Sequence, residues 1–368
     1  MNIVCDKTLL SAAIDGVSKA VTMRSSIPVL EGILLKAEGF QLTLTGYDLE
    51  MGIVTTIEAN IKEPGEIVLN AKLLSSMISR MPAGQISIVA ADNGKTTIQS
   101  GVAQFEIQSM PATDFPDLPN TGAEQTLTIK TGVLRDMIDR TLYAVSQDEK
   151  KPAHTGELFE IELDKLTIVA LDGYRLAIVE RPITAVKDIR IIVPSKTMTE
   201  VSHLLANDDE EDVHISANRR YVVFTTAGYT IMSRLIEGEF LNYRNVIPAG
   251  SCTRVTIDTK DFISTIERAS LIITERLKNP LRISFTEGKV VVRCQTNLGR
   301  VVDEFSAACE GDEVEIGFNN RYLLDALRNA RTEQVRMEIS GPLSPVKVLP
   351  VEGNDFLYLV LPVRFKND

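Results

Sequence analysis

Apolar and polar residues alternate along most of the chain, with the period of two that is typical of half-buried β-strands. Examples are the segments Gln41-Leu-Thr-Leu-Thr, Glu160-Ile-Glu-Leu and Arg254-Val-Thr-Ile-Asp. Antiparallel sheets with one face on a core and one face in water show this alternation. The pattern therefore predicts antiparallel sheets as the main component of the fold.

Other stretches have the spacing of three and four residues that indicates amphipathic helices. One predicted helix places these residues on one side: Leu134, Met137, Ile138, Thr141 and Val145. Another has an apolar stripe and a basic stripe: Leu323, Ala326, Leu327 and Ala330, and Arg321, Arg328 and Arg331. Side-chain oxygens at helix starts can accept the first free backbone N–H groups. The predicted N-caps are Asn70, Thr131, Thr259 and Asn319.

One strand, turn and helix pattern is written three times along the chain. The copies are Asn2-Ile-Val-Cys-Asp-Lys-Thr-Leu-Leu, Thr128-Ile-Lys-Thr-Gly-Val-Leu and Thr256-Ile-Asp-Thr-Lys-Asp-Phe-Ile. When they are aligned at Ile14, Ile138 and Ile266, the offsets are 124 and 128 residues. A second helix opens at Lys72, Lys196 and Arg321, with offsets of 124 and 125 residues. A repeat of this length is a whole domain.

The repeat predicts an α+β chain of three similar domains, each with antiparallel sheet and two helices. Their expected bounds are residues 1–121, 122–249 and 250–368. Pro116, Pro119 and Pro248 lie near the two seams, where a residue without an amide hydrogen ends sheet pairing. Copies of such a chain can close into a ring if they join head to tail.

The composition is that of an ordinary globular protein, with 44% hydrophobic and 24% charged residues. No stretch approaches the ~18 consecutive apolar residues of a membrane helix, and the start lacks the pattern of a signal peptide, so we expect a cytoplasmic protein. The four cysteines are widely spaced and the chain has three histidines. This predicts neither disulfides nor a zinc site, and no metal or cofactor is expected.

The net charge of −11 argues against tight DNA binding across the whole surface. Residues 1–121 carry 8 basic and 13 acidic groups, residues 122–249 carry 15 and 20, and residues 250–368 carry 16 and 17. Basic residues nevertheless recur at the second helix start of each copy, and Arg80, His203 and Arg328 follow about two turns later. Either they simply face water, or an assembled ring turns them toward a shared space that attracts phosphates weakly.

Asp48 and Glu50 are the one candidate pair for metal chemistry, because alternation places both carboxylates on one face of a strand. Asp48 recurs as Asp172 in the middle copy, whereas Tyr174 stands at the position of Glu50. A feature repeated without its partner favours a hydrogen bond in a turn, so no catalytic residue is predicted. Two functions therefore stay open from these residues. One is a metal-dependent nucleic-acid enzyme that uses Asp48 and Glu50, and the other is a three-domain binding scaffold that never encircles DNA.

Several segments are specific enough to indicate a family. They are Ala170-Leu-Asp-Gly-Tyr-Arg-Leu-Ala177, Tyr358-Leu-Val-Leu-Pro-Val-Arg-Phe365, Leu44-Thr-Gly-Tyr-Asp-Leu-Glu-Met51, Ile27-Pro-Val-Leu30, Asp114-Phe-Pro116 and Tyr243-Arg-Asn-Val-Ile-Pro248. The chain resembles, over its whole length, the bacterial β sliding clamps, which are the β subunits and processivity factors of DNA polymerase III.

The resemblance implies a non-catalytic protein that forms a head-to-tail homodimer. Six domains would close into a ring, with sheets outside and twelve helices lining a hole around duplex DNA. The protein would need no cofactor, would not bind membranes, and would join the nucleoid during replication.

The family also binds partner proteins through a short hydrophobic peptide, typically beginning with Gln and containing Leu or Phe. Implied partners are the replicative polymerase α subunit, the clamp loader, other polymerases, mismatch-repair proteins and ligase. Carried over onto this sequence, the peptide groove consists of His154, Leu171, Gly173, Tyr174, Arg175, Leu176, Leu241, Asn245, Val246, Leu343, Pro345, Val360, Leu361, Pro362, Val363 and Arg364. For residues 359–363 the alternative is a plain terminal strand.

This sequence departs from the family pattern at some groove positions. Leu171, Asn245 and His154 replace other residue types, and Lys366-Asn-Asp368 extends the customary end. We therefore expect a groove whose peptide preference differs from that of its relatives.

The repeat and the resemblance together predict where DNA and the second subunit bind. The expected DNA contacts are Arg24, Lys72, Lys196 and Arg282, followed by Arg80, Arg135, Arg140, Arg321 and Arg328. At the subunit seam, Phe105 and Ile107 on an edge strand are expected to meet Leu271, Ile272 and Ile273 of the other copy. The alternative for these five residues is a place in a core.

Overall fold

The computed structural model describes residues 1–122, 124–205, 209–226, 228–274 and 279–365, so the terminal Lys366, Asn367 and Asp368 lie outside the described residues. The chain divides into two compact units. The first unit contains Met1–Val133 and Thr199–Leu235, and the second contains Leu134–Met198 and Ile236–Asp368. The boundary falls inside the middle repeat because its strands join the sheets of both neighbouring repeats.

Among the described residues, the first unit has two antiparallel sheets. The larger follows the order β10-β15-β16-β17-β4-β3-β2-β6, and the smaller follows β5-β1-β7-β8-β9. In these orders, the strands of the larger sheet are Glu124–Lys130, Asp212–Ala217, Tyr221–Thr225, Tyr229–Arg234, Met51–Glu58, Gln41–Tyr47, Gly32–Glu38 and Gly65–Asn70. Those of the smaller sheet are Asn60–Glu63, Asn2–Asp6, Gln85–Ala90, Lys95–Ser100 and Ala103–Gln108.

The second unit is built in the same way, from one larger and one smaller antiparallel sheet. Their orders are β14-β11-β12-β13-β26-β25-β24-β18-β22 and β21-β20-β19-β23. The strands of the larger sheet are Ile189–Pro194, Gly156–Ile161, Lys165–Leu171, Arg175–Pro182, Phe356–Val360, Val346–Pro350, Gln334–Ile339, Thr253–Asp258 and Ala308–Gly311. Those of the smaller sheet are Gly299–Ser306, Lys289–Thr296, Leu281–Thr286 and Val314–Phe318.

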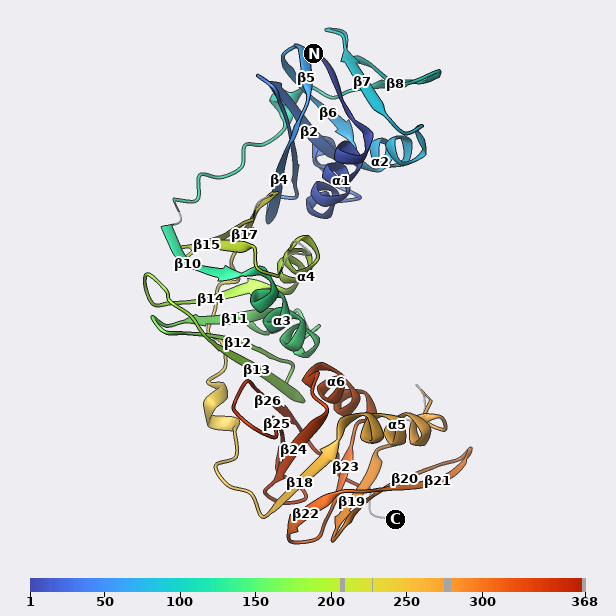
Figure 1. Ribbon diagram of the computed structural model, residues 1–368, viewed down its shortest axis with the longest axis vertical. Helices are drawn as coiled ribbons and strands as arrows, with labels where there is room; N and C mark the ends of the chain where they lie inside the picture. The colour runs from blue at the N-terminus through green and yellow to red at the C-terminus, as the bar shows by residue number, and fades with distance from the viewer. Residues whose placement is uncertain (123, 206–208, 227, 275–278, 366–368) are drawn as a thin grey trace. The chain divides into compact units, whose positions relative to one another are not determined.

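Two α-helices lie in each third of the described chain, which confirms the prediction from the repeat. They are α1 (Lys7–Val17), α2 (Ala71–Arg80), α3 (Thr131–Thr141), α4 (Ser195–Leu204), α5 (Thr259–Ser270) and α6 (Asn320–Ala330). In the first unit α1 packs on α2 and on strands β3 and β4 (Figure 1). In the second unit α5 packs on α6 and on β20 and β21. Each pair buries its apolar stripe against sheet.

The helix caps agree with the predictions in part. Asn70 and Asn319 are N-caps, and their side-chain oxygens accept from the N–H groups of Leu73 and Arg321, each at 3.0 Å. The prediction for Thr259 is wrong, because Asp258 caps α5 by accepting from the Asp261 N–H at 3.0 Å. Thr259 is buried as the first helical residue, so its hydroxyl points into the protein instead. Thr131 is likewise the first residue of α3.

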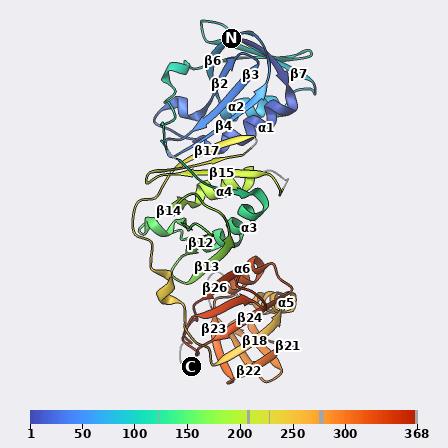
Figure 2. The ribbon, with the colours of Figure 1, turned by 60° about the vertical axis from the view of Figure 1, so that its left-hand side comes forward.

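One junction decides where the candidate site lies. Strand β13 of the middle repeat pairs with β26 of the last repeat, with Arg175 opposite Val360 and Leu176 opposite Leu359. Figures 1 and 2 both show these strands side by side in the second unit. The pairing brings together the two sequence segments that carry the family resemblance most specifically, although they are separated by more than 180 residues.

Candidate functional site

The turn between β12 and β13 carries the middle-repeat motif. Asp172 closes it by accepting, through Oδ1, from the backbone N–H groups of Tyr174 at 2.8 Å and Arg175 at 3.0 Å. Gly173 has a φ of 92°, a backbone conformation that glycine adopts with little strain. A side chain at this position would have room, so the φ angle rather than space accounts for the glycine. Tyr174 therefore projects from the end of the sheet with 59% of its surface exposed.

Arg175 anchors this turn to the last repeat. Its guanidinium pairs with Asp172 (Nε to Oδ2, 3.0 Å) and donates a short hydrogen bond to Asp325 on α6. It also lies over the rings of Tyr322 and Tyr143, at 4.8 and 5.3 Å from the ring centres. Because two carboxylates and two aromatic faces surround this cation, its role is to hold the site together.

Tyr322 is a site residue that the sequence reasoning missed. Its ring stacks on that of Tyr174, with the ring centres 5.7 Å apart and the planes inclined by 20°. It is the third residue of α6, in the first turn after the Asn319 cap. An aromatic residue at the exposed start of a helix was the available signal, but only the fold brings it against a turn 148 residues earlier in the chain.

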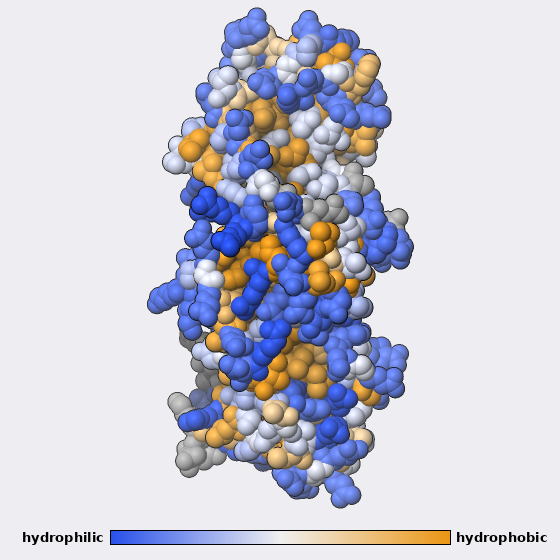
Figure 3. Space-filling model, turned by 90° about the vertical axis from the view of Figure 1, so that its left-hand side faces the viewer, coloured by the Kyte–Doolittle hydropathy of each residue, from blue (hydrophilic) through white to orange (hydrophobic). Residues whose placement is uncertain are grey.

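The other predicted groove residues divide into a buried floor and an exposed rim. Leu171, Leu176 and Val360 are at most 3% exposed, and the first two belong to one hydrophobic cluster with Phe240 and Tyr243. The rim consists of apolar side chains that are between 36% and 61% exposed: Tyr174, Leu241, Val246, Leu343 and Val363. On the face in Figure 3, hydrophobic residues gather in patches bordered by hydrophilic ones. Such patches mark interaction sites more often than plain surface.

The C-terminal segment leaves the sheet and crosses beside this rim. Strand β26 ends at Val360, so the alternative of a plain terminal strand holds only up to that residue. Beyond it, Leu361 donates its N–H to the Tyr174 carbonyl at 2.9 Å, and Val363 donates to the Gly317 carbonyl at 2.8 Å. Pro362, between them, has no amide hydrogen to donate. Arg364 follows as an exposed cation, and Pro345 directly precedes β25, whose first residue pairs with Val360.

His154 lies at the edge of the same cluster. Its ring meets that of Phe240 edge to face, with 5.5 Å between ring centres. Burial lowers the pKa of His154 below its ordinary value, and the nearby charge of Lys151 lowers it further. The side chain is therefore a neutral, aromatic surface at physiological pH rather than a cation.

The predicted wall residues Leu241, Asn245 and Val246 come from one connecting segment. Asn245 and Val246 belong to the short 3₁₀ helix η6 (Tyr243–Val246), and all three side chains are exposed. All sixteen predicted groove residues belong to the second unit.

The predicted DNA contacts divide by their surroundings. Six are exposed: Arg24, Lys72, Arg80, Lys196, Arg321 and Arg328. Arg328 also pairs with Glu267 at 2.7 Å. Arg140 pairs with Asp136 at 2.8 Å, and its side chain is 12% exposed. Arg282 lies 4.2 Å from the centre of the Phe365 ring, and Arg135 is half-buried on α3.

The predicted seam residues are exposed or only partly buried within their own units. Phe105 and Ile107 are on β9, an edge strand of the smaller sheet of the first unit, and Phe105 is 41% exposed. Leu271 is 82% exposed directly after α5, and Ile272 and Ile273 follow as half-buried residues. None of these five is fully buried, so a place in a core does not describe them.

Asp48 has the turn role that its repeat favours. Its Oδ1 accepts from the backbone N–H groups of Glu50 at 3.0 Å and Met51 at 2.7 Å, in the same arrangement as Asp172. Glu50 lies 3.7 Å from Arg234 and is exposed. Across the described part of the chain, no group of three or more His, Cys, Asp or Glu side chains is placed to hold a metal ion. No helix in that same part is long and apolar enough to cross a membrane.

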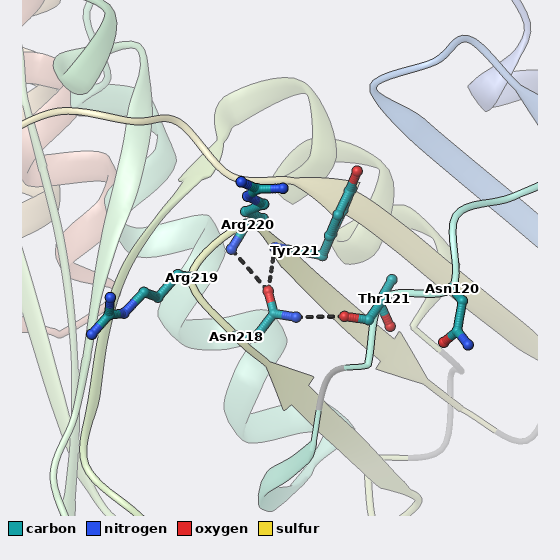
Figure 4. Close-up of a pocket in the computed structure, with 6 residues that line it drawn as sticks. All are labelled: Asn120, Thr121, Asn218, Arg219, Arg220 and Tyr221. Atoms are coloured by element: carbon teal, nitrogen blue, oxygen red, sulfur yellow. Dashed lines mark hydrogen bonds between the residues drawn. The ribbon is translucent and has the colours of Figure 1, made fainter.

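A shallow pocket of about 370 Å³ lies in the first unit, where the linker after the first repeat passes the β15–β16 turn. Asn218 joins the two by donating to the Thr121 carbonyl at 2.5 Å, while its own oxygen accepts from the N–H groups of Arg220 and Tyr221. Figure 4 shows Arg219 and Arg220 pointing in different directions rather than into one space. The pocket thus reflects how the linker is held and does not gather charge for a ligand.

Comparison with known proteins extends over all three predicted domains. Family models of the DNA polymerase III beta subunit match in order: the N-terminal domain at residues 1–119, the central domain at 128–242 and the C-terminal domain at 244–364. A "Beta sliding clamp" of Halalkalibacterium halodurans is 31% identical over 99% of this chain and all of its own length.

Solved structures agree with these sequence matches. A putative DNA polymerase III beta subunit from Eubacterium rectale has 31% identity and a TM-score of 0.95, with 99% of each chain covered. The DNA polymerase sliding clamp from Bacillus subtilis has 29% identity and a TM-score of 0.96, with all of each chain covered.

Proposed function

This chain belongs to the DNA polymerase III beta subunit family, and we propose that it is a sliding clamp for the replicative DNA polymerase. Two copies join head to tail into a ring of six domains, which in each copy are residues 1–121, 122–249 and 250–368. The ring encloses duplex DNA. The observation that carries the proposal is that three beta subunit models match successive thirds of a chain that repeats itself at domain length.

The distribution of charge supports a protein that stays on DNA because it encloses the duplex, rather than because it binds the duplex tightly. Lys72, Lys196 and Arg321 are exposed at equivalent helix starts, where they supply a few weak contacts to phosphates. The net charge of −11 disfavours DNA elsewhere on the surface. We assign the ring lining to Arg24, Lys72, Arg80, Lys196, Arg321 and Arg328, with the half-buried Arg135 and Arg282 beside them. Arg140 instead stabilises the second unit through Asp136.

The rim and floor in the second unit form the docking site for partner proteins in this proposal. Apolar side chains bury the hydrophobic residues of a partner peptide, while Arg364 and Asn245 supply polar contacts that orient it. The proposed partners are the polymerase α subunit, the clamp loader, other polymerases, mismatch-repair proteins and ligase. The clamp itself performs no chemistry in this proposal.

The dimer seam is formed by β9 of one copy and the segment after α5 of the other. Phe105 and Ile107 meet Leu271, Ile272 and Ile273 there, and sheet pairing continues across the joint. Retention on closed circular DNA after loading, compared with retention on linear DNA, tests the encircling function.

Arg364→Ala is expected to weaken the binding of a partner peptide by about tenfold, the value of one charge-assisted hydrogen bond. A synthetic peptide that begins with Gln and contains Leu and Phe serves as the probe, and fluorescence anisotropy gives its Kd. Deletion from Leu361 onward should weaken binding further, because it also removes the hydrogen bonds to Tyr174 and Gly317. The matched control is Arg219→Ala in the first unit. Unchanged peptide affinity in both test variants would remove the proposed groove.

Asp48→Ala is expected to lower the free energy of unfolding by about 1 kcal/mol, because two turn N–H groups lose their acceptor. The substitution should not change any activity on DNA, because neither the wild type nor the variant should cut or extend primed DNA in the presence of Mg²⁺. Gel analysis of the DNA checks this. An intrinsic nuclease or polymerase activity that disappears in Asp48→Ala would establish the enzyme alternative instead.

A further inference from the structure

A single carboxylate, that of Glu160 on β11, ties down the segment that carries one wall of the proposed groove. The Tyr243 hydroxyl donates to Glu160 Oε2 at 2.6 Å. Arg244 donates to both carboxylate oxygens, at 2.8 Å to Oε2 and 3.3 Å to Oε1. Arg190 on β14 adds an ion pair of 3.2 Å to Oε1. Glu160 is 9% exposed, so water competes little for these charge-assisted hydrogen bonds.

The tied segment alternates between the core and the surface. Phe240 and Tyr243 are 3% and 2% exposed within the hydrophobic cluster beneath it. Leu241 and Val246, from the same few residues, are 45% and 42% exposed. Because Tyr243 and Val246 are the two ends of one short 3₁₀ turn, an anchor on its inner side also sets where its outer side chains lie.

The apolar contacts of the same segment differ in kind from its hydrogen bonds to Glu160. The aromatic rings of Phe240 and Tyr243 hold the segment by apolar contact, which is non-directional. The bonds to Glu160 are directional, so they restrict the rotation of η6 about its axis. Arg244 also lies over the Tyr243 ring, 4.8 Å from its centre, so the carboxylate, the guanidinium and the ring form one connected unit.

We propose that Glu160 is a positioning residue for partner recognition, which holds Leu241, Asn245 and Val246 in the orientation that a partner peptide needs. It does so without touching the peptide. The inference rests on the proposed peptide-docking function. Without the carboxylate the buried Tyr243 hydroxyl loses its acceptor and Arg244 is released, so peptide binding must first order the wall, which lowers affinity.

Two substitutions and one matched control test this role. Glu160→Gln keeps an oxygen that can accept from Tyr243 but removes the charge that holds Arg244 and Arg190, and Glu160→Ala removes both. The control is Glu338→Gln, because Glu338 is also a part-buried carboxylate with several cations around it, namely Lys347, Arg254 and Arg336. It lies on β24 of the same sheet and has no hydrogen bond to the wall segment among the described residues.

The measurements are peptide Kd by fluorescence anisotropy, thermal unfolding, dimer mass, and hydrogen exchange of residues 241–246. We expect Glu160→Gln to weaken binding of the Gln-, Leu- and Phe-containing peptide about tenfold and Glu160→Ala to weaken it further. Exchange of the wall should accelerate in these two variants and slow again when peptide saturates them. Glu338→Gln should bind as wild type does, and the dimer mass should not change.

Three outcomes would overturn the inference. If wild type binds the peptide and both Glu160 variants bind it equally well, Glu160 does not position the wall. If Glu338→Gln weakens binding as much as Glu160→Gln, the effect is general destabilisation. If wild type itself binds no such peptide, the proposed docking function fails, and the inference fails with it. Should Glu160→Ala not fold, the Glu160→Gln variant alone decides.

Discussion

Loaded onto closed circular DNA, this protein is expected to remain bound through gel filtration, whereas it should leave the same DNA when linear. A ring that encloses DNA escapes only by opening or by sliding off an end. Electrostatic affinity cannot replace this mechanism, because no third of the sequence is basic overall. The comparison requires a clamp loader and ATP, and the readout is the fraction of protein that co-elutes with DNA.

Salt makes this test sharper. A protein that holds DNA through six to ten phosphate contacts loses a factor of about 10³–10⁵ in DNA affinity when the salt concentration rises from about 50 to about 200 mM. The protein on circular DNA is expected to stay, since its retention is topological. Cutting the circle with a restriction enzyme after loading should release it and is the internal control. Equal loss from circular and linear DNA would show that the protein does not encircle DNA.

The second large effect concerns stability, and it comes from a buried acid. Replacing Glu157 with Gln is expected to raise the free energy of unfolding at pH 8 by several kcal/mol. Glu157 on β11 is fully buried, and burial raises its pKa to about 8, against a smaller opposing effect of the Thr141 hydrogen bond. Its Oε1 accepts from the Thr141 hydroxyl at 2.6 Å. Its Oε2 has no hydrogen-bond partner among the described residues.

The sign follows from proton binding. The folded protein keeps the Glu157 proton up to about pH 8, whereas the unfolded chain releases it near the ordinary value of 4.5. The stabilisation is therefore complete below pH 4.5 and is lost as the pH rises through 8, by about 1.4 kcal/mol for each pH unit in between. Gln resembles the protonated acid and cannot ionise, so Glu157→Gln should lack this slope.

Urea unfolding between pH 5 and pH 9 measures the effect. Glu338→Gln is again the control: burial alone would raise the pKa of Glu338, but Lys347 and other cations outweigh burial and lower it. The contribution of Glu338 is present above its ordinary pKa and is lost only as the pH falls through the lowered value, so it adds no slope between pH 5 and 9. Parallel pH curves for wild type and Glu157→Gln would contradict the prediction.

Strand β11 also shows where reasoning from the hydrophobic pattern fails. The alternation Glu160-Ile-Glu-Leu predicts a half-buried strand, yet β11 ends at Ile161 inside that stretch, and all six residues of β11 are buried, including Glu157 and Glu160. Glu157 faces Thr141 at the end of α3, while Glu160 faces the segment around Tyr243 on the opposite side of the strand. A period of two says which residues share a face but not whether a distant segment covers the second face.

The candidate site shows the same division. The turn residues Asp172 to Arg175 could be recognised in the sequence because local chemistry requires them: an Asp that closes the turn and a Gly that accepts a positive φ. Tyr322 and Asp325 could not, because their contacts with Tyr174 and Arg175 join residues about 150 positions apart. Helix periodicity identifies only the side of α6 that faces the core.

By itself, the sequence determined the repeat of three, the antiparallel α+β fold with two helices in each repeat, the family and the segments that carry the site. These features depend on residue spacing, on local turn and cap chemistry, and on the likeness of one stretch of sequence to another, and none of them requires knowing which segments pack together. Only the tertiary structure decided that β13 pairs with β26, that Arg175 pairs with Asp325, and that Glu157 and Glu160 are buried. Those outcomes depend on which distant segments pack together, and burial, ion pairing and pKa are properties of that packing rather than of any residue alone.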